Sequence, residues 1–580
     1  MRNKLEKVTF VLGSQILLFV GFTIFFAAIF ILLNLKINFI SIIISFILSI
    51  IIGYIMLKNQ IIDVKERTKY ILGVNAIFIL VLVSCILLSA KFFDISFDGQ
   101  MYHQDAVIHL QEGWNPVYDD QLNEEYVPYI WVNHYAKASW YFATAIYDLM
   151  GNIEYGKSIN ILLLMSSILI VFSLILRVKD SLIFGIVCSI LIALNPVTIS
   201  QLFTFYVDGL LYSTLLILVT LLIRQFIEED LWSFFSIILV LIILINIKFT
   251  ALGYAIILCL LPVILKLYNL YFDKQIKSWK MLLRGSILQK VNLILVIGVI
   301  LGVLVVGSGS YVKNFIDHKH PLYPLAGEGK IDIITGNTPE NLRDKNKIEQ
   351  LYLSVFSEST NSLKGDLINK FPLTVTKAEL STIHGTDVRV GGFGPLFGAI
   401  IICTIIGLLI WKEIFMTRLG KIVIAIISVI IITIVINPEM WWARYVPQLW
   451  MIPIIFLLIL NIEKKNIYIK IYTVILLLVI GINSMIMAGI NYKYNSKIND
   501  DLIIQLEAMS EYSKSNEILI DFDVFKSNRA RLDYYDIEYS ESEELSCEIP
   551  QYIPFSNAVF CVDNLELFQK THTNIYNKYH

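Results

Sequence analysis

Long apolar runs that carry no charged residue constrain this chain more than any other feature. The runs 37–57 and 291–312 are both long enough to cross the hydrocarbon core of a bilayer, about 30 Å thick, as helices. The first run, 11–33, is too long for the core of a signal peptide, and a second run follows it at once, so we expect it to be retained. Hydrophobic residues make up 56% of the chain and charged residues only 16%. These features predict an all-α polytopic membrane protein.

The apolar pattern divides the chain into a multi-span part, residues 1–490, and a tail, residues 491–580. A multi-span part of this length needs many short connections between its spans. About thirteen spans are predicted, at roughly 11–33, 37–57, 70–92, 157–176, 181–196, 208–223, 232–246, 249–268, 292–312, 393–411, 421–437, 446–461 and 470–490.

The tail has the pattern of a small α/β domain. Strands are expected at Ile518–Asp521 and Ala558–Val562, with a short helix at Val524–Leu532 between them. Cys547 and Cys561 are close enough in the tail sequence to pair, although two cysteines alone define no disulfide framework.

Lysine and arginine in the short loops predict how the chain is oriented in the cell membrane. With the N-terminus in the cytoplasm, every short loop that holds two or more basic residues falls on the cytoplasmic side. An odd number of spans then places the C-terminus outside. Three long segments are therefore predicted to be external, 93–156, 313–392 and 491–580, and they contain all eight histidines.

Ionisable residues are nearly absent from the middles of the predicted spans. Ion-coupled transporters need such groups at mid-depth, so this class is disfavoured. The chain also lacks the basic stripe that nucleic-acid binding requires, and the lipid bilayer is its expected partner. Charge gathers instead where the spans meet the outer face, which predicts a site at that interface.

Asp98 is the first candidate at this interface, because it follows the end of the third predicted span. A carboxylate held there is able to act as a general base on a hydroxyl acceptor, with Tyr102 and His103 about one helical turn further on. The alternative is a solvated acid that begins a loop. Glu112 and Trp114, at a helix end and turn later in the same loop, are candidate substrate contacts.

Asp208, at the outer start of the sixth span, is a second candidate acid, and its alternative role is to cap that helix. Lys248 and Arg444 lie at tight outer turns, against the positive-inside rule. A lone outer cation is often a lipid anchor, and Trp442 beside Arg444 is also compatible with an aromatic belt. Two cations on the same face as two acids, however, suit the phosphate of a lipid carrier.

The second external loop supplies further candidate substrate contacts at its two ends, Lys313 at the start and His384 and Arg389 at the close. His318 and His320 lack the cysteine or carboxylate pattern of a known metal site. No cofactor is predicted, and a divalent metal finds no support in the sequence.

At these residues the chain resembles the GT-C superfamily of membrane glycosyltransferases, which use sugars linked to polyprenyl phosphate. Asp98, in Phe-Asp-Gly-Gln-Met-Tyr-His, takes the place of the acid in the first external loop of that family. Asp208 in Tyr-Val-Asp-Gly resembles the family's second acid, and Lys248 a lysine at a later outer turn. The segment 313–324 is similar to an Asn-Pro-x-x-Pro-like element, and 441–447 to the late Arg-Tyr-x-x-Pro element.

The resemblance covers roughly residues 70–490. It implies transfer of a sugar from a polyprenyl-phosphate donor to a hydroxyl of a glycan, lipid or protein, with Asp98 as base and Asp208 assisting. Lys248 and Arg444 would then stabilise the departing lipid phosphate. Two rival functions are left open. A glycan polymerase or ligase would depend on loop arginines such as Arg343 or Arg389, and a lipid-linked glycan flippase would need a hydrophilic path between the halves.

Overall fold

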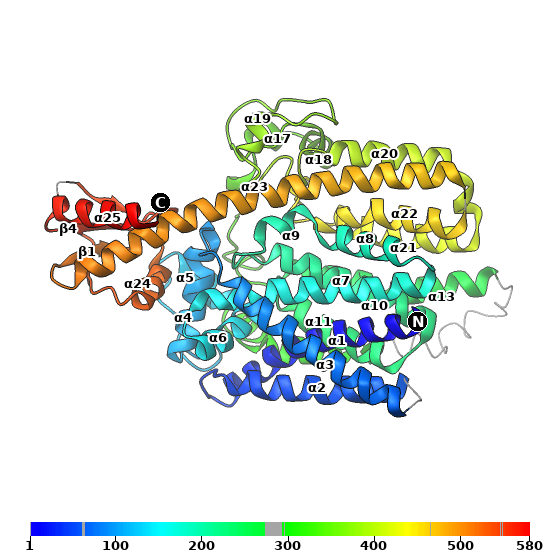
Figure 1. Cartoon of the computed structure of the whole chain (residues 1–580), viewed down its shortest axis with the longest axis horizontal. Helices are drawn as coiled ribbons and strands as arrows, with labels where there is room; N and C mark the ends of the chain where they lie inside the picture. The colour runs from blue at the N-terminus through cyan, green and yellow to red at the C-terminus, as the bar shows by residue number, and fades with distance from the viewer. Residues whose placement is uncertain are drawn as a thin grey trace.

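The computed structural model describes residues 2–60, 64–272, 293–294, 296–333, 335–464, 466–545, 547 and 549–579. Its larger part is a bundle of roughly parallel helices, and a small tail domain extends from one end of that bundle (Figure 1). The chain is therefore a helical membrane protein with a small sheet near its C-terminus, as the apolar pattern predicts. The helices of the bundle are α1 (Arg2–Leu32), α2 (Ile40–Gln60), α3 (Val64–Ser89), α7 (Ser158–Val178), α8 (Leu182–Ala193), α9 (Pro196–Gln201), α10 (Asp208–Glu228), α11 (Leu231–Ile245), α12 (Thr250–Cys259), α13 (Leu261–Phe272), α20 (Phe397–Ile410), η6 (Lys412–Met416), α21 (Arg418–Val435), η7 (Pro447–Trp450), α22 (Met451–Glu463) and α23 (Ile467–Ser513).

Not every predicted span is a helix long enough to cross a bilayer. Among the described residues, eight helices have that length and apolarity, and four predicted spans correspond to shorter apolar helices, α8, α11, α20 and the pair η7–α22. Thirteen crossings therefore stay a prediction.

The predicted span 292–312 is broken in the structure. It is a pair of helical segments, Val296–Val306 and Ser308–His318, bent by 70°. Wide π-helical turns, η3 (Leu301–Val306) and η4 (Ser308–Val312), flank Gly307 at the bend. The Asn246 side chain donates to the Gly302 carbonyl at 2.8 Å, which satisfies a backbone group near the break.

The helices α1 and α7 pack closely against one another. A Cβ atom at Gly13 would lie 2.8 Å from Ile170, so only glycine allows the two helices to approach this closely. Ser166 donates to the Gly13 carbonyl at 2.8 Å across the same contact. These two contacts fix the α1–α7 pair.

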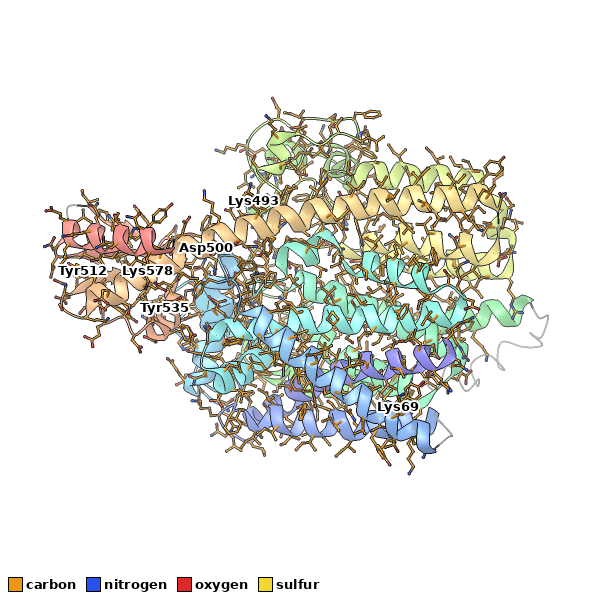
Figure 2. The ribbon with its side chains drawn as sticks, in the orientation of Figure 1. Lys69, Lys493, Asp500, Tyr512, Tyr535 and Lys578 are labelled. Carbon is orange, nitrogen blue, oxygen red and sulfur yellow. A yellow bond between two sulfur atoms is a disulfide. The ribbon has the colours of Figure 1, made fainter. Side chains whose placement is uncertain are left out.

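The two ends of the bundle differ in character. The N-terminus and Lys69 lie at the end opposite the tail domain, in which Tyr512 and Tyr535 lie (Figures 1 and 2). An ion-pair group joins α1 and α10 through the buried Arg224, whose guanidinium lies 2.7 Å from Glu6 and 2.9 Å from Glu228. The loops that are predicted to be cytoplasmic, because of their basic residues, begin at this end of the bundle.

Helices of the two loops that are predicted to be external bring their charged residues back to the bundle. The first loop contains η1 (Gly99–His103), α4 (Gln104–Glu112), α5 (Pro128–His134), α6 (Ala138–Met150) and η2 (Ile153–Lys157). The second contains α16 (Lys313–His318), η5 (Thr335–Asn337), α17 (Glu340–Arg343), α18 (Lys347–Phe356) and α19 (Lys377–Leu380). Capping boxes at Asn346 and Thr376 start α18 and α19, each with a glutamate three residues on.

The tail has the predicted α/β character. Its four-stranded sheet has the order β2-β1-β4-β3, with β1 parallel to β2 and antiparallel to β4. Cys547 and Cys561 form a disulfide, so the proposed pairing is confirmed. The elements are β1 (Ile518–Asp521), η8 (Lys526–Asn528), α24 (Arg529–Tyr534), β2 (Ser540–Glu541), β3 (Gln551–Tyr552), β4 (Val559–Val562) and α25 (Leu565–Tyr579).

The helix α23 connects the bundle to the tail without a break. It is 47 residues long, and Lys493 and Asp500 lie on it between the two parts (Figure 2). Its last turns belong to the tail, because Leu502 and Leu506 are buried in a cluster with Ile518 and Phe560 of the sheet.

Candidate active site

Arg444 is the centre of a cluster of ion pairs that joins four distant parts of the chain. It lies in the turn between α21 and η7, and its guanidinium faces three carboxylates. The Arg444 Nε donates to Asp208 Oδ2 at 2.8 Å, Nη1 lies 2.8 Å from Asp387 Oδ1, and Nη2 lies 3.5 Å from Asp98 Oδ2. The planar guanidinium has donors on several edges, so one arginine is able to hold three acids at fixed positions.

Asp208 is the most enclosed acid of the cluster, with no exposed side-chain surface. Its Oδ1 accepts a hydrogen bond from Lys248 Nζ at 2.5 Å, and its Oδ2 also accepts one from Gln201 Nε2 at 3.2 Å. Asp208 begins α10, yet its side chain caps no helix, because Val207 takes the N-cap position without a side-chain bond. Capping as the role of Asp208 is therefore wrong; the side chain anchors two cations instead.

Aromatic rings enclose the two cations. The guanidinium carbon of Arg444 lies 4.8 Å from the centre of the Tyr206 ring and 5.4 Å from that of Trp442. Lys248 Nζ lies 4.2 Å above the Tyr445 ring. These cation–π contacts, together with the carboxylates, compensate the loss of water around the cations. The side chains of Lys248 and Arg444 keep 18% and 12% of their surface exposed, so a ligand is able to reach both.

Asp98 is the least firmly held of the three acids. It precedes η1, its side chain is 25% exposed, and its only ion pair in the described structure is the 3.5 Å contact with Arg444. Burial raises the pKa of Asp98 to about 6, against the opposing effect of Arg444, and Asp387 and Asp208 raise it further. A hydrogen bond from the Tyr206 side chain acts in the other direction. Asp98 therefore has the pKa of a group that exchanges protons near neutrality.

The three carboxylates outnumber the two cations by one, which leaves an excess negative charge in a largely buried place. Burial alone would lower the pKa of Lys248, and Asp208 opposes that change. The carboxylates around Arg444 hold its pKa well above the usual value although burial acts against them. A proton on Asp98 would remove the excess charge without disturbing the other four groups.

Tyr102 and His103, predicted as substrate contacts, are buried in the loop instead. The His103 Nδ1 accepts a hydrogen bond from the Trp140 indole at 2.7 Å, and burial lowers the pKa of His103 to about 3. The Tyr102 ring packs edge-on against Tyr135, with 5.9 Å between ring centres. Both side chains lie near enough to the Arg444 cluster for its charges to affect their pKa values, and contact with a substrate stays a prediction for both.

Three other predicted contacts have partners outside the Arg444 cluster. Glu112 is 64% exposed at the end of α4, 3.8 Å from His109 Nδ1. Trp114 follows a left-handed Gly113 and donates to the Asp120 carbonyl at 3.4 Å. Lys313 lies 3.8 Å from Asp317 on the next turn of α16.

The end of the second external loop, by contrast, reaches the cluster. The Thr386 carbonyl accepts from Gln201 at 3.2 Å, and the ring of His384 packs against Tyr494 of α23, with 3.6 Å between centres. Arg389 is tied to Asn337 and Asn361 and lies over the Trp442 ring at 5.7 Å. Trp442 itself is buried, as is its stacked neighbour Trp441, so the aromatic-belt interpretation of this pair is wrong.

Asp387, Gln201 and Tyr206 are parts of the cluster that the sequence did not single out. Asp387 lies between the predicted site residues His384 and Arg389. Its acidic side chain in that place was the only feature of the sequence that could have marked it as part of the site. Nothing in the local sequence marks Gln201, whose amide donates to Asp208 and accepts from the Gly209 backbone at 2.8 Å. Within the described ranges, no group of three or more His, Cys, Asp or Glu side chains is arranged to hold a metal ion.

Comparison with known proteins adds no assignment: no protein-family model matches the chain, and no curated protein matches it. Function is therefore inferred from the chemistry of the Arg444 cluster.

Proposed function

We propose that this chain is a membrane glycosyltransferase. It transfers a sugar from a polyprenyl-phosphate donor to an acceptor hydroxyl at the outer face of the membrane, in the synthesis of a cell-envelope glycan or glycoconjugate. The observation that carries the proposal is the convergence of Asp98, Asp208 and Asp387 on Arg444, with Lys248 on the same acid. A proton-exchanging carboxyl beside two partly exposed cations matches the needs of a reaction that deprotonates a hydroxyl and releases a phosphate.

Asp98 is the general base of the proposed reaction. It takes the proton of the acceptor hydroxyl while that oxygen bonds to the anomeric carbon of the sugar. The bond from this carbon to the phosphate oxygen breaks on the opposite side, so the configuration inverts and the lipid phosphate leaves with the electron pair. Among the three acids, Asp98 combines a pKa of about 6 with an exposed quarter of its side chain.

Lys248 and Arg444 stabilise the negative charge that develops on the departing phosphate. Once Asp98 holds the acceptor proton, the carboxylates no longer outnumber the cations, and the attraction of Lys248 and Arg444 for an anion becomes stronger. Proton transfer and phosphate departure thus support one another. Asp208 and Gln201 orient the two cations through the hydrogen bonds described above, and Trp442 fixes the far side of Arg444.

The experiment that tests the proposal uses purified protein in liposomes with a panel of polyprenyl-phosphate sugars. Release of polyprenyl phosphate that depends on Asp98 supports the proposal, and cell-envelope glycans with and without the protein identify the product by mass spectrometry. Sugar donors that are all left intact, together with an unchanged glycan profile, would overturn it.

A glycan polymerase or ligase is supported less well. That function was tied to loop arginines, and in the structure Arg343 donates to the Thr338 carbonyl at 3.2 Å while Arg389 binds Asn337 and Asn361. Both arginines hold the second external loop together. No observation favours a flippase.

A further inference from the structure

A second group of buried charges lies beside the Arg444 cluster and includes a residue of the tail. Asp94, Glu154, Lys157 and Arg531 are each at most 2% exposed. The Lys157 ammonium lies 2.6 Å from Glu154 Oε2, and the Arg531 guanidinium lies 3.4 Å from Glu154 Oε1. Two acids and two cations are thus balanced away from water, and removal of any one leaves a buried charge without compensation.

Arg531 reaches this group from α24 of the tail, more than 370 residues further along the chain than Glu154. One edge of its guanidinium donates to the backbone carbonyl of Asp94, and Nη1 donates to Gln100 Oε1 at 3.0 Å. A second tail residue, Ser527, donates to the Gln100 carbonyl at 2.5 Å. The tail therefore holds the chain on both sides of Asp98, four residues before it and two residues after it.

Asp94 connects this group to the second acid of the site. Its Oδ2 accepts from the backbone N–H of Phe205 at 2.6 Å, three residues before Asp208. A Cβ atom at Gly99 would overlap the Asp94 carboxylate, so the residue that follows Asp98 packs directly on this acid. Arg531, through the Asp94 segment, is thus one contact away from the chain around Asp98 and from the chain around Asp208.

We propose that Arg531 is a positioning residue, through which the external tail holds Asp98 in its partly buried place beside Arg444. The inference rests on the proposed function, since it assigns the tail a role in the same site. Without Arg531, the segment 94–100 loses the anchor that holds both of its ends, water reaches Asp98, and the carboxyl regains the properties of a solvated acid, although Ser527 and Phe205 still bind the segment. The tail is then a component of the catalytic centre that never touches the substrate.

The matched control is Arg529, which lies two residues away on the same helix. Its guanidinium binds Glu541 of the tail at 2.6 Å, so Arg529→Gln removes an arginine from α24 while the hydrogen bonds between Arg531 and the segment 94–100 stay in place. Arg531→Gln removes the anchor, and Arg531→Lys keeps the charge but not the planar fork. Ser527→Ala is a milder change at the same interface, for use if Arg531→Gln does not fold.

The experiment measures how fast a carbodiimide modifies Asp98 as a function of pH, in full-length protein without any donor, by mass spectrometry of the peptide that contains it. Carbodiimides react with protonated carboxyls, so the midpoint reports the pKa of Asp98. We expect a midpoint near 6 in the wild type and in Arg529→Gln, and a downward shift toward about 3.9, the value of a solvated aspartate, in Arg531→Gln. Arg531→Lys should restore part of the shift, and Ser527→Ala should show a smaller one.

Unchanged midpoints in Arg531→Gln and Ser527→Ala would overturn the assignment, and so would equal shifts in Arg529→Gln and Arg531→Gln, since these indicate general loosening of the tail. Transfer assays add a second readout, in which kcat falls in Arg531→Gln and the KM for the donor is kept. The two proposals fail separately. If Asp98→Asn proves fully active while the labelling midpoint still depends on Arg531, the glycosyltransferase mechanism fails and the positioning contact stands.

Discussion

Arg444 and Asp208 lie 236 residues apart in the chain, and the hydrogen bond of 2.8 Å between Nε and Oδ2 joins the turn after α21 to the start of α10. The pair is shielded by the rings of Tyr206 and Trp442. Because the side chain of Asp208 has no exposed surface, the proposed reaction assigns the role of proton acceptor to Asp98. This division of roles leads to the following predictions.

Replacement of Asp98 by asparagine should reduce transfer by about 10²–10⁴-fold, the usual contribution of a general base. Asparagine keeps the size of the side chain and accepts no proton, so donor binding should survive. Initial rates and donor titrations in liposomes measure the two effects. Asp105→Asn is the matched control: Asp105 is buried on α4, its Oδ2 accepts no hydrogen bond from the described residues, and burial raises its pKa to about 7. Asparagine resembles the protonated acid, and an equal loss in both variants would refute a special role of Asp98.

The pH dependence of transfer should follow the ionisation of Asp98. The base works only when it is ionised, so kcat/KM should fall as the pH drops through about 6, with a tenfold loss per unit below that value. Burial raises this pKa and the hydrogen bond from Tyr206 lowers it. Tyr206→Phe should therefore move the midpoint to higher pH. A midpoint that moves down, or stays fixed at the ordinary value of an aspartate, would contradict this account.

Removal of the Lys248 charge should destabilise the protein as well as weaken use of the donor. Lys248→Met leaves the buried Asp208 with one cation fewer, a change that costs on the order of 3 kcal/mol for buried pairs. The double variant Lys248→Met/Asp208→Asn should regain much of that stability but not the activity. Thermal unfolding of the double variant and of both single variants in detergent measures the stability, and the transfer assay in liposomes measures the activity. If the two single changes are simply additive, the ion pair is not the source of the effect.

The orientation in the membrane should be opposite for the two termini. A reporter fused after His580 is expected to be active only if it works outside the cytoplasm, and one fused before Arg2 only if it works inside. The positions of the N-terminus and of the tail at opposite ends of the bundle agree with this expectation (Figure 1). A cytoplasmic signal from the C-terminal fusion would place the Arg444 cluster on the wrong side for an external acceptor.

The sequence predicted the apolar helices and the tail strands well, because both depend on local patterns of hydrophobic residues. It also placed Asp98, Asp208, Lys248 and Arg444 on one face, and the structure brings all four together; their chemical roles stay proposals. The positive-inside rule singled out Lys248 and Arg444, since a cation on the unexpected side of the membrane needs a partner.

Other parts of the site depend on tertiary packing and left no local signal. Tyr102 and His103 follow Asp98 closely, but the π-helical turn η1 directs them into the loop interior against Trp140. Asp387 and Arg531 come from segments that are far from the first loop in the sequence and are brought close to it only by the tertiary fold. The bend at Gly307 was hidden because a broken helix and a straight one have the same hydrophobic composition.

The continuity of α23 determines how the tail is held. At 47 residues the helix is about 70 Å long, more than twice the thickness of the hydrocarbon core. No flexible linker separates the bundle from the tail, so docking of Arg531 costs little chain entropy. The helix α23 acts as a rigid rod that keeps the tail beside the first loop at a high local concentration. A change in the tilt of that rod would move the tail as one body, so the thickness of the surrounding bilayer would act on the face of the protein that is predicted to be external.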